Sequence, residues 1–161
     1  MLIIIVIKGP AGVGKTTTCE SLLPKLKDFE YVNLESLKTQ FGHLDRAEKK
    51  AQAHAIYYPR IKKLIIQGKN ILLQETFISD LKKELGADLE LHNYRIISIF
   101  LKASLKETKR RNRVRDQKTL SDEYLEESYT YLAVPESGDK IINVETHSPQ
   151  EVVAQILLLL K

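Results

Sequence analysis

Cysteine is almost absent from this chain of 161 residues, which contains only Cys19. A single cysteine cannot form a disulfide bond within the chain, so a fold that depends on internal disulfide bridges is excluded. Cys19 lies inside an expected helix, where a small thiol is suited to filling space in the core. We therefore expect an intracellular, cytoplasmic protein.

Long hydrophobic runs are also missing. The apolar run at residues 2–7 is shorter than the hydrophobic region of a signal peptide, has no basic flank before it and leads directly into a glycine-rich turn. The leucine-rich run at residues 156–160 is far shorter than the roughly 20 residues that a membrane-spanning helix needs. We therefore expect neither a signal peptide nor a membrane partner.

Positive charge is not spread along the chain. Residues 106–118 hold seven basic and two acidic side chains, a charge of +5, and because the formal net charge is +4, the rest of the chain carries −1. A protein that holds a long nucleic-acid duplex usually spreads its basic residues over a broad face. The concentration in one segment indicates a local anionic target instead.

Five short apolar runs predict β-strands at residues 2–7, 30–33, 70–75, 94–101 and 140–144. The first run is continuous and β-branched, as in a central strand that is buried on both faces. Helical patterns lie between the runs, and strands that alternate with helices form parallel βαβ units. No repeat or linker interrupts this alternation. The pattern predicts a single α/β domain over residues 1–161, with a five-stranded parallel sheet and helices on both faces.

The helical segments have recognisable starts and interruptions. Asp45, Ser104 and Ser148 each stand three residues before a glutamate, which is the spacing of a helix-capping box. Pro59 is expected to kink or divide the helix at residues 45–68, and Gly86 to interrupt the helix at residues 81–91. The remaining helices are expected at residues 15–27, 35–41, 121–132 and from 149 onward.

The strongest motif is GPAGVGKT at residues 9–16, which matches the phosphate-binding pattern G-x-x-x-x-G-K-[ST] between a strand and a helix. The glycines allow backbone N–H groups to converge on phosphates, and the helix N-terminus adds a positive dipole. Lys15 is expected to reach the β- and γ-phosphates of ATP, and the Thr16 hydroxyl to bind Mg²⁺. The predicted nucleotide-binding residues are Gly9, Pro10, Ala11, Gly12, Val13, Gly14, Lys15, Thr16 and Thr17.

Other classes of P-loop protein lack support in this sequence. No N-K-x-D motif for reading guanine occurs, and no D-x-x-G switch follows the P-loop, which argues against a GTPase switch. The chain is also too short for the accessory regions of oligomeric ATPase motors. A short P-loop domain with a basic segment after its fourth strand is the layout of small kinases.

Several segments in order make the resemblance narrower. IIIVIKGPAGVGKTTTCESLL, FEYVNLESLK, NILLQETF and LKASLKETKRRNRVRDQKTLSDEYLEESYTYL resemble the 5′-hydroxyl polynucleotide kinase and zeta-toxin-like branch of P-loop kinases. The resemblance covers residues 2 to about 132. It implies a three-layer P-loop kinase fold with a helical lid, here at about residues 106–120, and transfer of phosphate from ATP with Mg²⁺.

Two acidic residues match carboxylates of that family. Glu35, just after the second strand, would orient the acceptor hydroxyl and take its proton. The alternative is that Asn33 caps a helix and Glu35 merely complements its dipole. Glu75, at the end of the third strand, would hold Mg²⁺ together with Thr16 because Gln74 cannot carry a charge.

The basic segment offers arginines at helical spacing. Arg110 and Arg113 share a face, as do Arg111 and Arg115, and the planar guanidinium suits a transferring phosphoryl group. Arg111, Arg115 and Arg113 are therefore expected to clamp phosphate from a lid that has few apolar anchors and is exposed. The alternatives are a solvated charged helix or a site for an RNA or DNA 5′ end.

The sequence thus predicts an ATP-dependent phosphotransferase that acts on a hydroxyl acceptor, most simply a 5′-hydroxyl nucleic acid end or a nucleotide-like substrate. A small-metabolite kinase is the alternative within the same class. A regulatory protein that binds and hydrolyses ATP and acts through a partner is the alternative from another class. The chain is expected to be a monomer or a homodimer.

Overall fold

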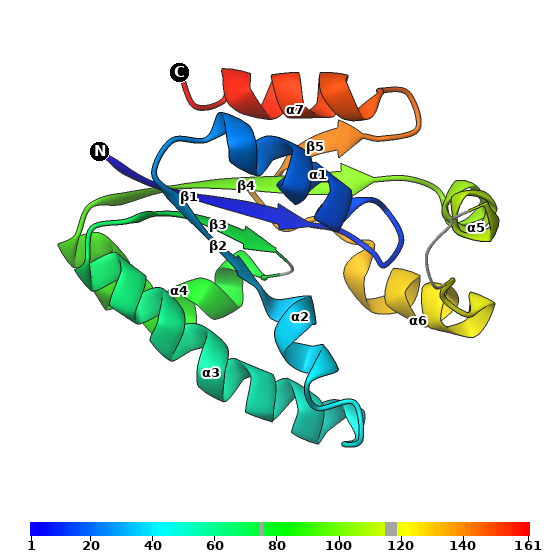
Figure 1. The fold of residues 1–161 in the computed structure, drawn as a ribbon, viewed down its shortest axis with the longest axis horizontal. Coiled ribbons are helices and arrows are strands. Elements are labelled where there is room, and N and C mark those ends of the chain that lie inside the picture. The colour runs from blue at the N-terminus through cyan, green and yellow to red at the C-terminus, as the bar shows by residue number, and fades with distance from the viewer. Residues whose placement is uncertain (75, 115–118) are drawn as a thin grey trace.

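The computed structural model describes residues 1–74, 76–114 and 119–161, and within them five strands form one sheet (Figure 1). All neighbouring strands are parallel and follow the order β2-β3-β1-β4-β5. This arrangement confirms the predicted α/β fold. The strands are β1 (Leu2–Lys8), β2 (Phe29–Asn33), β3 (Asn70–Gln74), β4 (Tyr94–Lys102) and β5 (Lys140–Asn143).

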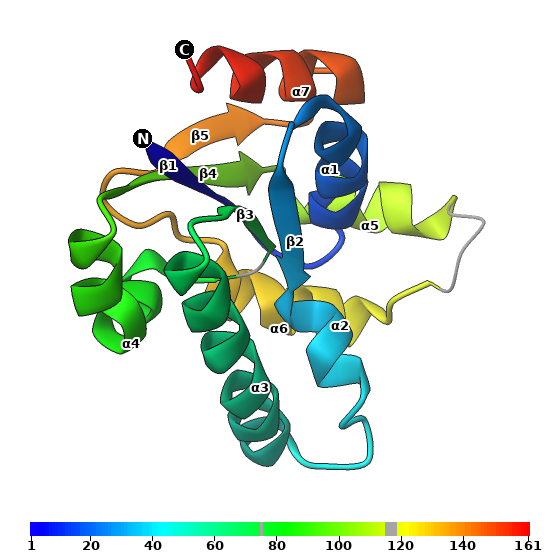
Figure 2. The same ribbon diagram turned by 60° about the vertical axis from the view of Figure 1, so that its left-hand side comes forward.

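Helices connect the strands and cover both faces of the sheet. Figures 1 and 2 show α1 and α7 on one face and α3 and α4 on the other. The helices are α1 (Lys15–Leu22), α2 (Leu34–Thr39), α3 (Arg46–Ile66), α4 (Ile78–Leu91), α5 (Leu105–Arg113), α6 (Asp122–Leu132) and α7 (Pro149–Leu158), with a short 3₁₀ helix, η1 (Leu23–Lys25). None of the helices in the described ranges is long and apolar enough to cross a membrane.

The central strand β1 divides the core into two halves. Its side chains alternate in direction, so Ile5 and Ile7 pack under α1 and α7 while Ile4 and Val6 pack against α3 and α4. All four are fully buried, as the continuous apolar run predicted. Cys19 belongs to the first half, and burial raises the pKa of its thiol to about 12, which confirms the core-filling role.

Neither Pro59 nor Gly86 divides its helix. Pro59 lies within α3, which runs without division from Arg46 to Ile66. Proline leaves the carbonyl of Ala55 without its helical partner, but both residues are exposed and water can satisfy that group. Gly86 likewise lies inside α4, where Leu81 and its buried neighbours on the same face outweigh the roughly 1 kcal/mol cost of a helical glycine.

Helices α5 and α6 pack beside the carboxyl ends of the strands, next to the loop that follows β1 (Figure 2). As expected, α5 has few apolar anchors, but buried polar side chains hold it in place. Thr108 is fully buried, and the Asn112 side chain both donates to the Leu120 carbonyl at 2.7 Å and accepts from the Leu120 N–H at 2.9 Å. Ser104 caps α5 as predicted.

Candidate functional site

The loop between β1 and α1 is shaped by glycines at positive φ. Gly9 has a φ of 142°, and a β-carbon there would lie only 2.6 Å from the carbonyl oxygen of Leu101. Gly12 has a φ of 76°, and a β-carbon there would meet Thr108 at 2.8 Å and Leu125 at 3.2 Å. Only glycine fits both positions without strain, so the loop can lie directly against β4, α5 and α6.

Lys15 is folded back over this loop. Its Nζ donates hydrogen bonds of 2.9 Å to the carbonyl oxygens of Gly9 and Pro10, and its side chain is 7% exposed. The amine is therefore held at the mouth of the loop, where phosphate oxygens would meet it. On the other side of the loop, the N–H of Ala11 donates to Ser128 Oγ of α6 at 2.6 Å.

A chain of uncharged side chains reaches Thr16 from the sheet. Gln74 Nε2 donates to Thr16 Oγ1 at 3.0 Å, and the Tyr31 hydroxyl donates to Gln74 Oε1 at 2.5 Å. The side chain that contacts the predicted metal ligand is therefore Gln74. Glu75, for which the sequence predicts metal binding, lies outside the described residues.

The described residues suit a magnesium ion that is held mainly by nucleotide. No cluster of three or more His, Cys, Asp or Glu side chains in the described ranges could hold a metal by itself. Mg²⁺ in nucleotide sites commonly binds through one or two protein oxygens together with substrate phosphates and waters. The Thr16 hydroxyl, oriented by Gln74, is suited to be the protein oxygen ligand of such a site.

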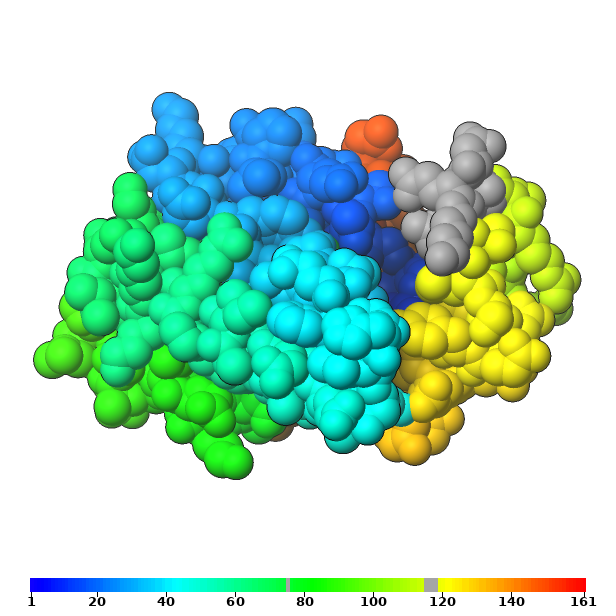
Figure 3. Space-filling model, turned by 60° about the horizontal axis from the view of Figure 1, so that its bottom comes forward, coloured from blue at the N-terminus to red at the C-terminus, as the bar shows by residue number. Residues whose placement is uncertain are grey.

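Two adjoining cavities lie at this edge of the sheet. The first, here called the P-loop cavity, has a volume of about 210 Å³. The second, called the side cavity, has a volume of about 490 Å³ and lies among α2, α3 and α6. Figure 3 shows the cleft between α2, in cyan, and α6, in yellow. The P-loop cavity is lined by Ala11, Gly12, Gly14, Lys15, Thr16, Thr17, Glu35, Gln74, Leu120 and Tyr124.

Glu35 and Tyr124 line both cavities. Glu35 lies in the first turn of α2, and the cap of that helix is Asn33, whose Oδ1 accepts from the N–H groups of Glu35 at 2.9 Å and Ser36 at 3.3 Å. The predicted cap at Asn33 is confirmed. Capping therefore does not require the Glu35 carboxylate, which stands between the P-loop and the side cavity.

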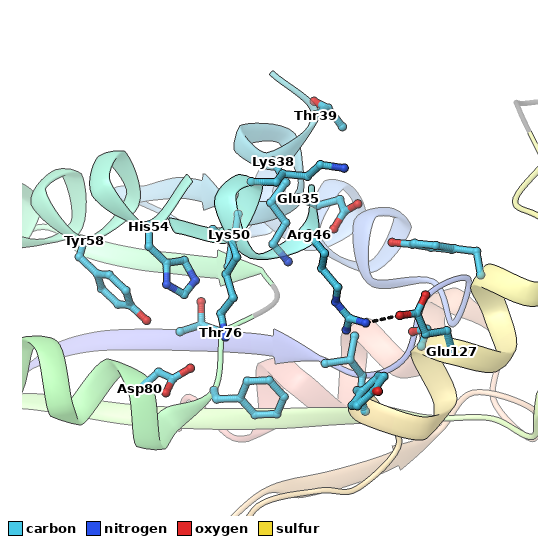
Figure 4. A pocket seen from close by; sticks show the side chains of 17 residues that line it. Glu35, Lys38, Thr39, Arg46, Lys50, His54, Tyr58, Thr76, Asp80 and Glu127 are labelled. Carbon is cyan, nitrogen blue, oxygen red and sulfur yellow. Dashed lines mark hydrogen bonds and ion pairs between the residues drawn. The ribbon is translucent and has the colours of Figure 1, made fainter. Parts of the chain in front are cut away.

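The walls of the side cavity come from elements that are distant in the sequence. Lys50, His54 and Tyr58 recur every four residues along α3 and project from one face of it (Figure 4). Arg46 forms an ion pair with Glu127 of α6. The cavity is completed by Leu34, Lys38, Thr39, Lys49, Thr76, Phe77, Asp80, Tyr131, Leu132 and Ser128, besides Glu35 and Tyr124.

His54 is a neutral side chain at neutral pH. Its half-buried position lowers the pKa of the imidazole, and the nearby positive charges of Lys50 and Lys38 lower it further, against the opposing effect of Asp80. The neutral ring packs edge-on against Tyr58 at a centroid distance of 5.2 Å. His54 can thus act as a hydrogen-bonding group in the cavity, and no positional pattern of histidines in the sequence indicated it.

Two of the predicted phosphate-clamping arginines, Arg111 and Arg113, line neither of the two cavities. Arg111 donates to Glu107 Oε1 at 2.6 Å and to the Val144 carbonyl at 2.8 Å, and Arg113 lies 3.4 Å from Asp122. Hydrogen bonds from Arg110 and then Arg111 lower the pKa of Glu107 to about 2. Arg115 lies outside the described residues.

A cluster of ionic side chains lies at the carboxyl end of β1, beside the start of α4. Lys8, at the end of β1, forms ion pairs with Glu136 and, at 2.9 Å, with Asp139. Glu136 also accepts hydrogen bonds from the backbone of Ile78 and Ser79 at the start of α4. Burial acts to raise the pKa of Glu136, but the bonds from Lys8 and Ser79 outweigh it and lower that pKa to about 2. Nothing in the local sequence links these residues.

Comparisons with known proteins agree with this geometry. The chain resembles a candidate kinase of Chloroflexus aurantiacus over 99% of its own length and 96% of that chain, at 19% identity and a TM-score of 0.73. It resembles a gluconokinase of Sinorhizobium meliloti over 96% and 89% of the two chains, at 16% identity and a TM-score of 0.70. It also resembles a chain of the Pnkp1/Rnl/Hen1 RNA repair complex, covering 80% of its own length and 43% of that chain, at 17% identity and a TM-score of 0.64.

At these identities the solved structures show the fold alone. A search of curated proteins finds no match. The AAA domain family model, however, matches residues 4–130, which include the P-loop, Glu35, α5 and α6 up to Thr130. The chain therefore belongs to this family of P-loop kinases.

Proposed function

We propose that this protein transfers the γ-phosphate of ATP to a hydroxyl acceptor held in the side cavity. The observation that carries the proposal is the position of Glu35, which lines the P-loop cavity and the side cavity at once. A kinase needs a nucleotide site and an acceptor site that meet at a carboxylate, because the two substrates must be aligned for in-line transfer. The two adjoining cavities supply that arrangement.

In the proposed reaction the acceptor oxygen forms a bond to the γ-phosphorus, and the bond between that phosphorus and the β–γ bridging oxygen breaks. ADP leaves, and the proton of the acceptor hydroxyl passes to Glu35 and then to solvent. Lys15 moves from the carbonyls of Gly9 and Pro10 to phosphate oxygens, where its charge stabilises the negative charge that spreads over them. Mg²⁺ bound with the nucleotide would neutralise part of that charge.

A nucleotide-like acceptor or a 5′-hydroxyl nucleic acid end is the best-supported substrate. Tyr124 and Tyr131 line the side cavity and are 43% and 60% exposed, so part of each aromatic side chain is accessible to a flat base, while Arg46 lies over the Tyr131 ring. The likeness to a chain of an RNA repair complex points the same way. A small-metabolite acceptor is the second candidate, because a volume of about 490 Å³ is that of a small-molecule pocket.

The proposal also includes Arg111 and Arg113 of α5, which would bind phosphate oxygens when the lid closes over the nucleotide. Arg111 and Arg113 would have to exchange their bonds to Glu107 and Asp122 for phosphate oxygens. Both acidic partners are partly exposed, so solvent screens these ion pairs and keeps them weak. The exchange is therefore energetically accessible when a nucleotide binds.

The test is transfer of labelled γ-phosphate from ATP to a panel of 5′-hydroxyl oligonucleotides, nucleosides, nucleotides and sugars. Labelling of at least one acceptor is expected, and Lys15→Ala should abolish it, while the exposed Lys27→Ala serves as a control with the same change of charge. Hydrolysis of ATP that no acceptor changes, with no labelled product, would favour a regulatory ATPase instead. Transfer that survives Lys15→Ala would contradict the P-loop assignment.

A further inference from the structure

Basic and acidic side chains are distributed unevenly around the side cavity. Its basic side chains come from the end of α2 and the first turns of α3, namely Lys38, Arg46, Lys49 and Lys50, and its acidic side chains are Glu35, Asp80 and Glu127. Arg46 is neutralised by its ion pair with Glu127 and lies over the Tyr131 ring at 4.6 Å. Glu35 stands at the junction with the P-loop cavity, and Asp80 comes from α4.

Lys49 and Lys50 are the cations of this cavity without an acidic partner. In the described part of the chain neither forms an ion pair, whereas Lys62 of the same helix is paired with Asp88 at 3.1 Å. Lys50 extends from α3 into the cavity (Figure 4), and its charge helps to lower the pKa of His54. Two ammonium groups on one wall of a half-enclosed cavity create a positive potential that an anion would relieve.

Glu35 marks the part of the side cavity that adjoins the P-loop cavity. Because it faces the P-loop cavity as well, the acceptor hydroxyl must lie at that end if phosphate is to be transferred. A negative group on the acceptor beside Glu35 would be repelled, whereas the same group beside Lys49 and Lys50 would be attracted. The charges of the cavity therefore favour one orientation of an acceptor that has a hydroxyl at one end and an anion at the other.

From these charges we propose that the acceptor is an anionic small molecule, with its phosphate or carboxylate group bound by Lys49 and Lys50 while its hydroxyl faces Glu35. This inference rests on the proposed kinase function and adds the substrate class. Binding of the anion restricts the acceptor to a pose in which the hydroxyl reaches the γ-phosphate, so its loss should lower transfer through both binding and orientation.

The experiment compares matched acceptors that differ by one anionic group. Adenosine and adenosine 3′-phosphate share a free 5′-hydroxyl and test phosphate; sorbitol and gluconate, which are both open-chain, test carboxylate. We expect kcat/KM for at least one anionic member to exceed that for its neutral partner by about tenfold or more, because the two ammonium groups attract the anion and fix the position of the acceptor. The pair of acceptors that shows this preference identifies the bound anion as phosphate or carboxylate. Equal kcat/KM in both pairs would overturn the inference and leave the kinase function standing.

Variants connect the preference to the two lysines. The double variant Lys49→Met, Lys50→Met should reduce the preference for the anionic acceptor to nearly one. Lys49→Arg with Lys50→Arg should restore it, and Lys63→Met, an exposed lysine of α3 outside the cavity, should not change it. A preference that persists in the double methionine variant would contradict the assignment.

A binding measurement separates the inference from the proposed function. If neither pair is phosphorylated, calorimetric titration of adenosine 3′-phosphate and gluconate into the ADP-bound protein still decides the question. Binding of either that falls at least tenfold in the double methionine variant would support the anion site without kinase activity. Equal binding to both proteins, or no binding to either, would overturn it.

Discussion

Gln74 Nε2 lies 3.0 Å from Thr16 Oγ1 and donates a hydrogen bond to it, so an uncharged amide occupies the place beside the predicted magnesium ligand. Gln74 is itself held by the Tyr31 hydroxyl and is 1% exposed. Because the amide donates to the Thr16 oxygen, one lone pair of that oxygen is used and its direction is fixed. Among the described residues, the side chain that contacts the predicted metal ligand Thr16 is thus an uncharged amide.

Gln74→Glu should therefore strengthen the binding of Mg²⁺ with nucleotide. A carboxylate beside Thr16 attracts the cation directly or through water, and we expect the Mg²⁺ concentration for half-maximal ATP binding to fall several-fold. Titration of Mg²⁺ against a fluorescent ATP analogue measures this change. The exposed Gln52→Glu on α3 is the control, and an unchanged Mg²⁺ requirement in Gln74→Glu would show that this position does not reach the ion.

Glu35→Gln should lower kcat far more than it raises KM for the acceptor. The amide keeps the shape of the side chain and can still hydrogen-bond the hydroxyl, but it cannot accept its proton, and a general base contributes about 10²–10⁴-fold to rate. Steady-state kinetics with the best acceptor measure the effect. Glu30→Gln, at an exposed position of β2, should leave kcat unchanged, and equal activity of both variants would reduce Glu35 to a residue that complements the α2 dipole.

Gly12→Ala should destabilise the contact of the P-loop with α5 and α6. The new β-carbon would lie 2.8 Å from Thr108 Cγ2 at a φ of 76°, and strain of this kind costs of the order of 1–3 kcal/mol. Thermal unfolding should show a lower midpoint, and ATP binding should weaken. Gly86→Ala has open space around its β-carbon inside α4 and should instead stabilise the protein by about 0.5–1 kcal/mol, so opposite signs are expected from the same substitution.

Glu136 should make the stability depend on pH below about 4.5. Its pKa is lowered from 4.5 to about 2 in the folded protein, so its contribution is complete above the unfolded pKa and disappears as the pH falls from about 4.5 to 2. Glu136→Gln should lower the free energy of unfolding at pH 7 by about 2 kcal/mol, the scale of a hydrogen bond to a charged group.

The difference between Glu136→Gln and the unchanged protein should shrink as the pH falls through that window. Urea unfolding at pH 7, 4 and 3 measures it, with the exposed Glu123→Gln as the control. A difference that is constant with pH would mean that the variant acts through lost packing and not through the charge of Glu136.

Local sequence signals determined the elements and the nucleotide loop. The apolar run of β1, the cap at Asn33 and the capping box of Ser148 and Glu151 all appear as predicted, because each depends on residues within a few positions of one another. The P-loop motif is equally local. The alternation of strands and helices was enough to predict a parallel sheet, because crossovers of this length join parallel strands.

Tertiary structure decided which side chains surround the site. The contact of Gln74 with Thr16 spans 58 residues, and the bond from Ala11 to Ser128 spans 117. Local rules also overestimated the helix-breaking effect of Pro59 and Gly86. The carbonyl that Pro59 leaves free is exposed to water, and burial of the leucine face of α4 outweighs the low helix propensity of Gly86. The arginines of α5 illustrate the same limit: their spacing was visible in the sequence, but their partners, Glu107, Asp122 and the Val144 carbonyl, depend on how the helix packs.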